Sequence, residues 1–111
     1  MKDKIKAQKI RELNDAFRKT FEGGRVVTTL GVDALDGEAK DKVIAAVQGF
    51  TKFHKANDPH DEHDFGSLTV DHGFYCWKID YYDLAMSQHS LDPANAEATI
   101  RVLTIMCVDE Y

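Results

Sequence analysis

The stretch that decides the fold is FGSLTVDHGFYCWKIDYY, residues 65–82. Two β-rich runs, 65–71 and 74–82, flank Asp71-His72-Gly73, whose residue types suit the positive φ angles of a tight turn. We therefore predict a β-hairpin. Alternation along the second run gives it a face that we predict to be buried, made of Tyr75, Trp77, Ile79 and Tyr81. The opposite face carries Phe74, Cys76, Lys78, Asp80 and Tyr82.

Two helices and a strand are predicted before the hairpin. Residues 3–22 form the first helix, and Gly23-Gly24 ends it. Its apolar stripe, at spacings of three and four, is Ile10, Leu13, Phe17 and Phe21. Residues 25–30 are short and β-branched, so we predict a strand. The first nine residues are rich in lysine, and we expect them to form a basic arm that frays.

The second helix is predicted at about residues 37–55, with Asp33 or Asp36 as its N-cap. Its expected buried stripe is Val43, Val47, Phe50 and His54. We expect Asn57-Asp58-Pro59 to close this helix, since proline cannot continue it.

The C-terminal segment is predicted as a third helix, residues 93–109. Asp92 supplies an N-cap and Pro93 suits the first helical position. The run 102–108 is also apolar and strand-like in composition, so a strand is the alternative. The expected fold is a single α+β domain over residues 1–111, in the order α-β-α-β-β-α with a helix or a strand last. Its helices pack on a small, mainly antiparallel sheet of about three to four strands.

Composition indicates a globular cytoplasmic protein. The chain has 111 residues, of which 43% are apolar and 30% charged. No apolar run approaches a membrane span, and the N-terminal residues contain no apolar signal region. Cys76 and Cys107 do not form a zinc-binding pattern, and we expect both to be reduced. We expect a monomer or small homo-oligomer that does not bind membranes.

The net charge of −5 is unevenly distributed along the chain. Residues 56–111 carry eleven acidic side chains against only Lys78 and Arg101. An acidic half repels phosphates, so nucleic acid is not an expected partner. It attracts a basic protein surface, or imitates a nucleic-acid duplex toward the groove of another protein. The alternative is that these charges only keep a small protein soluble.

Several unusual strings resemble the bacterial domain-of-unknown-function family 3768. They are Glu62-His63-Asp64-Phe65-Gly66, the run 77–83, Asp92-Pro93, the run 101–106 with Glu110-Tyr111, Asn14-Asp15-Phe17 and Gly24-Arg25-Val26-Val27. The likeness covers nearly the whole chain. The family has no established activity, so it implies no catalytic residues. Its members are small proteins of mostly proteobacterial genomes and plasmids, which implies an accessory role in mobile DNA.

Two kinds of chemistry are alternatives to simple binding. A divalent metal is the alternative cofactor, with His60, His63 and Asp64 as ligands, because imidazole and carboxylate together suit transition metals. An acid–base enzyme is the other alternative, and it requires its residues to converge on a concave pocket. Those residues are Glu62, His63, Asp64, Lys78 and Asp80.

The function that we expect is binding of a protein, without catalysis or a cofactor. Aromatic and acidic side chains on one sheet face resemble an interface anchor with a charged rim. The predicted binding residues are Glu62, His63, Asp64, Phe74, Lys78, Asp80, Tyr82, Asp83 and Arg101. Within the mobile-DNA role, the specific hypothesis is an anti-defence protein whose acidic half blocks a restriction or CRISPR component.

Overall fold

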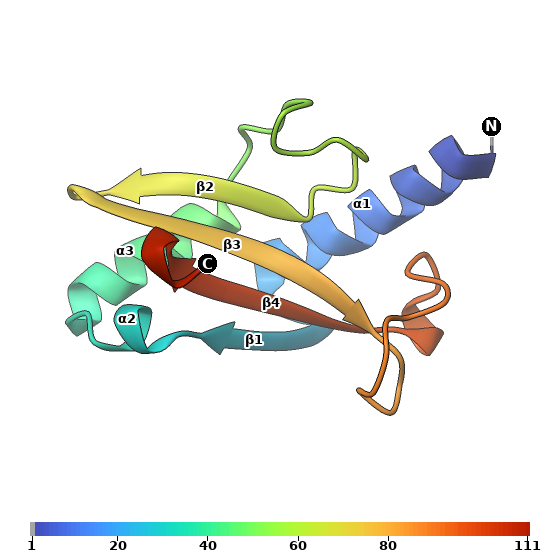
Figure 1. The fold of residues 1–111 in the computed structure, drawn as a ribbon. Coiled ribbons are helices and arrows are strands. Elements are labelled where there is room, and N and C mark those ends of the chain that lie inside the picture. Colours follow the sequence, from blue (N-terminus) through green and yellow to red (C-terminus); the bar gives the residue numbers. More distant parts are fainter. Residues whose placement is uncertain (1) are drawn as a thin grey trace.

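The computed structural model describes residues 2–111 and confirms the predicted α+β class (Figure 1). Its elements are α1 (Lys2–Thr20), β1 (Gly24–Thr28), α2 (Leu30–Asp33), α3 (Gly37–Gln48), β2 (Phe65–Val70), β3 (Gly73–Tyr82), the 3₁₀ turn η1 (Ala96–Ala98), β4 (Ile100–Cys107) and the 3₁₀ turn η2 (Val108–Glu110). Among these residues, no helix is both long enough and apolar enough to cross a membrane.

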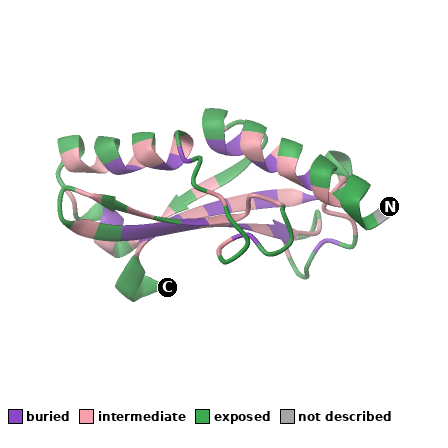
Figure 2. Ribbon diagram, turned by 90° about the horizontal axis from the view of Figure 1, so that it is seen from above, coloured by how far each residue is buried: buried purple, intermediate pink, exposed green. Residues whose placement is uncertain are grey.

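The four strands form one mixed sheet in the order β1-β4-β3-β2. The β2–β3 and β3–β4 pairs are antiparallel, whereas β1 pairs with β4 in parallel. Helices α1 and α3 lie on one side of the sheet, and the C-terminal end lies on the other (Figure 2). We call the side away from α1 and α3 the open sheet face. The face toward α1 and α3 can therefore form the core, whereas the open sheet face lies at the surface of the molecule.

The predicted hairpin is confirmed, with the turn placed on two residues instead of three. Asp71 and His72 have φ angles of 48° and 74°, and both central φ angles are positive in a type I′ turn. Gly73 already belongs to β3 and pairs with Val70. It is needed for space, because a Cβ there would lie 2.5 Å from Oη of Tyr75.

The core lies between the sheet and the two long helices. The predicted inner face of β3 is confirmed, since Tyr75, Trp77, Ile79 and Tyr81 are all buried. Ile10 and Phe17 of the predicted α1 stripe are buried as well, while Leu13 and Phe21 are half-buried. The core is completed by Val32, Val43, Val47, Phe50, Leu103 and Ile105. Burial of these apolar side chains is the main stabilising contribution to such a domain.

The prediction of a C-terminal helix over 93–109 is wrong, and the strand alternative is correct. Residues 100–107 form β4, which lies between β1 and β3 in the sheet. A β-branched apolar run gains two rows of backbone hydrogen bonds in that central position, and this outweighs its helical spacing. Asp92 and Pro93 lie in a turn, where the Asn95 N–H donates to the Asp92 carbonyl at 2.9 Å.

The second helix begins as predicted but ends earlier. The side chain of Asp36 accepts a hydrogen bond from the Ala39 N–H at 2.8 Å, so Asp36 is the N-cap. The helix stops at Gln48, before Gly49, and not at Asn57-Asp58-Pro59. His54 is consequently exposed in a turn and not part of a buried stripe. Phe50 still reaches the core from beyond the helix, with its ring edge-on to Trp77 at 5.6 Å.

Glu110 ties η2 to the loop that follows β1. Its carboxylate accepts hydrogen bonds from the Thr29 hydroxyl at 2.6 Å and from the backbone N–H groups of Gly31 at 2.8 Å and Cys107 at 2.9 Å. These donors, the Thr29 hydroxyl foremost, lower the pKa of Glu110 to about 2. The contacts hold the C-terminal turn beside the open sheet face. Cys107 and Cys76 are both free thiols.

Candidate functional site

The sheet separates the predicted binding residues onto two sides. Phe74, Lys78, Asp80 and Tyr82 alternate with the buried residues of β3 and therefore point to the open sheet face. Arg101 is paired with Tyr81 in the sheet and lies on the helix side, where Glu62 also contacts Tyr81. The predicted residues consequently do not form one site. The proposed acid–base set is not brought together, because Lys78 and Asp80 lie across the sheet from Glu62.

The middle of the open sheet face is a charged pair among uncharged neighbours. Lys78 Nζ lies 3.0 Å from Asp80 Oδ2, and this hydrogen bond raises the pKa of the Lys78 ammonium. The residues opposite them on β4 are Thr104 and Val102. Both members of the pair are partly exposed, so the pair contributes little to stability.

The hairpin end of the open sheet face is apolar and exposed. Phe74 is 67% exposed and Val108 is 47% exposed. Together they line two shallow hollows of about 410 and 320 Å³. Tyr111 packs edge-on against Phe65 at 5.7 Å while remaining largely exposed. Aromatic side chains exposed next to hollows are typical of protein interfaces.

Arg101 belongs to a buried hydrogen-bond network on the helix side. Its Nε donates to Asn14 Oδ1 at 2.8 Å, and its guanidinium also donates to the Pro93 carbonyl. Asn14 Nδ2 donates to the Tyr81 hydroxyl at 2.8 Å, and that hydroxyl donates to Glu62 Oε1 at 2.9 Å. Burial raises the pKa of Tyr81 and lowers that of Arg101. Because all of these groups are satisfied internally, we assign the network a structural role.

Asp64 and Asp83 also have local structural partners. The Asp64 carbonyl accepts the Ile79 N–H at 2.9 Å, and burial, followed by the neighbouring charge of Glu62, raises the pKa of its carboxyl group. The Asp83 carboxylate accepts the Ser87 N–H at 3.0 Å, which lowers its pKa. Asp83 thus caps the loop that follows β3.

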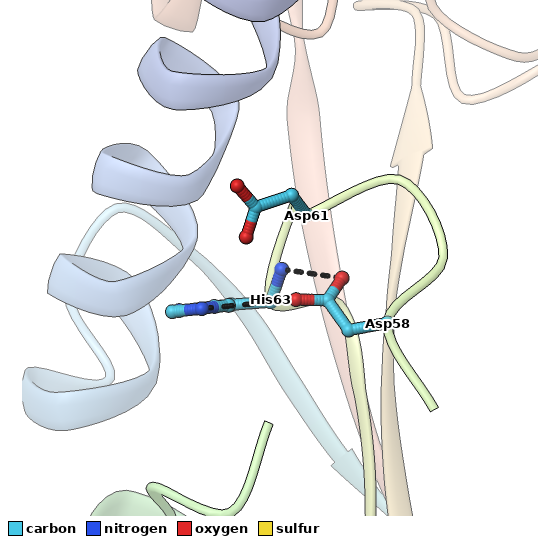
Figure 3. Close-up of side chains that lie close together, drawn as sticks. All are labelled: Asp58, Asp61 and His63. Atoms are coloured by element: carbon cyan, nitrogen blue, oxygen red, sulfur yellow. Dashed lines mark hydrogen bonds and ion pairs between the residues drawn. The ribbon is translucent and has the colours of Figure 1, made fainter. Parts of the chain in front are cut away.

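A second polar cluster forms where the 58–63 loop packs against α1. Asp58 Oδ1 accepts the backbone N–H groups of Glu62 at 2.9 Å and His63 at 3.1 Å, which folds the loop back on itself (Figure 3). Nδ1 of His63 lies 2.9 Å from Asp15 Oδ1. The His63 ring stacks on Phe53 with centroids 3.7 Å apart and planes 4° apart.

The predicted ligand set His60, His63 and Asp64 is replaced by a different grouping. His60 is exposed, and among residues 2–111 the ligand atoms that lie within 4.8 Å of one another include those of Asp58, Asp61 and His63. These three residues line an open hollow of about 730 Å³ together with Phe53, His54, Lys55 and Pro59. Of the predicted metal ligands, only His63 is in this group.

Sequence reasoning missed three residues of α1 that hold these clusters. Asn14 and Arg18 are fully buried, and Asp15 lies between Arg18 and His63. The Arg18 guanidinium lies over the rings of Phe53 and Trp77, at 5.3 and 5.2 Å. Their positions in the sequence could have revealed them, because Asn14 and Arg18 are four residues apart and lie beside Phe17 on the apolar stripe of the helix. Polar residues at such positions indicate a buried network.

Comparison with known proteins gives one match. A family described as "Protein of unknown function (DUF3768)" matches residues 28–110. Neither the search of curated proteins nor the search of solved structures returns a match. The matched region includes the strands β2, β3 and β4 and the whole 58–63 loop. It covers well over half of the chain, and the protein therefore belongs to the DUF3768 family.

Proposed function

We propose that this protein is a non-catalytic binding module that holds a partner protein against its open sheet face. The observation that carries the proposal is the exposure of Phe74, an aromatic side chain that no core contact requires, beside Val108 and two hollows. Large apolar side chains in such settings are the residues that dominate interface energies. The covered face of the sheet supplies the core, so the open face is free to bind.

The charges around this surface favour a protein with apolar and basic groups. Lys78 is already paired with Asp80, which leaves Asp83 and the overall charge of −5 to act on a partner. A basic protein surface is attracted by that charge, which speeds its association. Nucleic acid fits poorly, since its binding depends on several unpaired lysines and arginines along one surface.

The narrower form of the proposal is an accessory role in mobile DNA, with inhibition of a restriction or CRISPR component as its most specific version. It is supported by the family resemblance and by the eleven acids of residues 56–111. The fold neutralises part of that charge, since Asp61 pairs with Arg11 and Asp71 pairs with Lys42. We therefore base the proposal on the open sheet face and not on imitation of nucleic acid.

Site-specific photo-crosslinking tests the proposal. A photoreactive phenylalanine analogue is placed at Phe74 or at Tyr82, and the protein is expressed in cells of its source organism. We expect one discrete adduct with a second protein from both positions. Substituting Val108→Lys beside Phe74 is expected to weaken that adduct at least tenfold, because it puts a positive charge in the contact area of a basic partner.

The matched control places the same analogue at Glu12, which is exposed on α1. That position faces away from the sheet surface and is expected to give no discrete adduct. Adducts of equal yield from Glu12, or none from either sheet position, would contradict the proposal. An adduct that contains only a second copy of this chain, with a dimer seen by light scattering, would replace the partner protein with self-association.

A further inference from the structure

The cluster between the 58–63 loop and α1 has features that a structural role does not require. The side chain of Asp58 is only 3% exposed. Its Oδ1 accepts two backbone N–H groups, but no hydrogen bond from residues 3–111, whose side chains are described, ends on Oδ2. Because Asp58 lines the open hollow beside this loop, Oδ2 is left for a proton, a water molecule or a cation to satisfy.

His63 faces that oxygen and is held in a defined orientation. A carboxylate only accepts hydrogen bonds, so the Asp15 contact at 2.9 Å requires Nδ1 of His63 to carry a hydrogen. Asp15 is held in turn by Arg18 at 3.0 Å, and the imidazole ring is fixed against Phe53. The remaining ring nitrogen, Nε2, lies 3.7 Å from Asp58 Oδ2, which is too long for a direct hydrogen bond.

We infer that Nε2 of His63 and the carboxylates of Asp58 and Asp61 bind a divalent transition-metal ion. Bonds of about 2.1 Å from such an ion to nitrogen and oxygen span up to about 4.2 Å between two ligands. The gap of 3.7 Å between Nε2 and Oδ2 therefore accommodates one ion. One imidazole with two carboxylates is a donor set suited to Zn²⁺ or Mn²⁺.

Asp15 acts as the outer partner of the histidine in this arrangement. Metal-binding histidines usually donate their second ring N–H to a carboxylate or a carbonyl, which fixes the ring and raises its basicity. The Asp15–His63 contact has this form. The predicted ligands His60 and Asp64 have no part in it.

Asp61 completes the set from the exposed side. Its side chain is 73% exposed, and its Oδ2 lies 2.7 Å from Arg11 Nη1. An exposed ion pair of this kind is weak, so a small rotation can turn the carboxylate toward the ion. The open hollow of about 730 Å³ gives the ion and its water ligands access to all three residues. This site lies on the opposite side of the sheet from the open sheet face and does not depend on the proposed function.

The alternative is an ion-free cluster in which a doubly protonated His63 lies between Asp15 and Asp58. Isothermal titration calorimetry of chelator-treated full-length protein with ZnCl₂, and separately with MnCl₂, distinguishes the two. We expect one ion per chain for at least one of the metals. In long-range ¹H–¹⁵N spectra of the histidine side chains, the metal is expected to shift His63 Nε2 and to leave Nδ1 protonated.

Substitutions assign the binding to these residues. We expect His63→Gln and Asp61→Asn each to weaken binding at least tenfold, and Asp15→Asn to weaken it about 10- to 100-fold. The matched controls are His60→Gln, in the same loop, and His54→Gln, which lines the same hollow. Both controls are expected to bind the metal as the unmodified protein does.

Circular dichroism checks that each variant is folded. Asp61→Asn decides the question even if His63→Gln fails to fold, because Asp61 is exposed and pairs with Arg11 at the surface. The inference is overturned if neither metal gives a binding isotherm. It is also overturned if Asp61→Asn binds normally, or if the His54→Gln and His60→Gln variants lose binding to the same extent.

Discussion

Tyr81 and Tyr82 are chemically identical neighbours that β3 assigns to opposite environments. Tyr81 is buried on the helix side, and its hydroxyl connects Asn14 to Glu62. Tyr82 is half-buried on the open sheet face, and its hydroxyl takes part in none of the side-chain hydrogen bonds formed within residues 3–111. The pair therefore contrasts a tyrosine held in the buried hydrogen-bond network with one that lies on the open sheet face.

We predict that Tyr81→Phe lowers the free energy of unfolding by about 1–3 kcal/mol, the usual cost of leaving a buried polar partner unsatisfied. The substitution removes two hydrogen bonds and leaves Asn14 Nδ2 with only the Glu62 carbonyl, at 3.0 Å. Tyr82→Phe is the matched control and is expected to change stability by less than about 0.5 kcal/mol. Urea denaturation measures both, and equal effects would contradict the assignment of the two faces.

At the level of secondary-structure elements, the hairpin turn shows that neighbouring residues are constrained for different reasons. Its two positive φ angles belong to Asp71 and His72, although glycine is the residue that adopts them most easily. Gly73 has a different role, because it leaves room for the Tyr75 ring, whose Cε2 would lie 2.7 Å from an added Cβ. The turn and the first residue of β3 should consequently respond to substitution in opposite directions.

We predict that His72→Gly stabilises the protein by about 0.5 kcal/mol, since relief of the left-handed backbone slightly exceeds the added entropy of the unfolded chain. Gly73→Ala is expected to destabilise it by about 1–3 kcal/mol, because the new methyl group overlaps Tyr75. Thermal and urea denaturation measure both changes. A stabilising Gly73→Ala, or a destabilising His72→Gly, would show that the turn is built differently.

At the scale of the whole molecule, α1 completes a core that the remaining elements cannot close. It contributes Phe17 to the hydrophobic core and the buried polar groups of Asn14 and Arg18. Arg18 donates to the Phe50 carbonyl at 3.2 Å, which fixes the segment after α3. Among residues 3–20 of α1, Ile10 is the first that is buried, so residues 3–9 extend past the core.

We predict that a fragment of residues 23–111 does not fold, although it contains all four strands of the sheet. Without α1, Arg101 loses Asn14, and the inner face of the sheet is exposed to water. A fragment of residues 10–111 is the control, and we expect it to unfold cooperatively, because it lacks only the segment predicted to fray. Circular dichroism and ¹H–¹⁵N spectra of the two fragments test this. Cooperative unfolding of the shorter fragment would contradict the proposed role of α1.

The α+β class, the hairpin, the first helix and the two faces of β3 could be predicted from the amino-acid sequence. These features depend on contacts between near neighbours and on the alternation of side chains along one strand, which are visible in the residue pattern. The sequence also indicated a polar cluster near His63, whereas the role of Phe74 as an anchor stays a prediction.

The packing of the whole chain was needed to show that residues 100–107 form a strand and that Arg101 is buried. The strand is stabilised by pairing with both β1 and β3, and Arg101 meets Asn14 across 87 residues of sequence. The His63 cluster likewise depends on Asp15 of α1, which lies 48 residues before His63 in the sequence. Such contacts join segments that have no local pattern in common, so their identity depends on how the helices pack on the sheet.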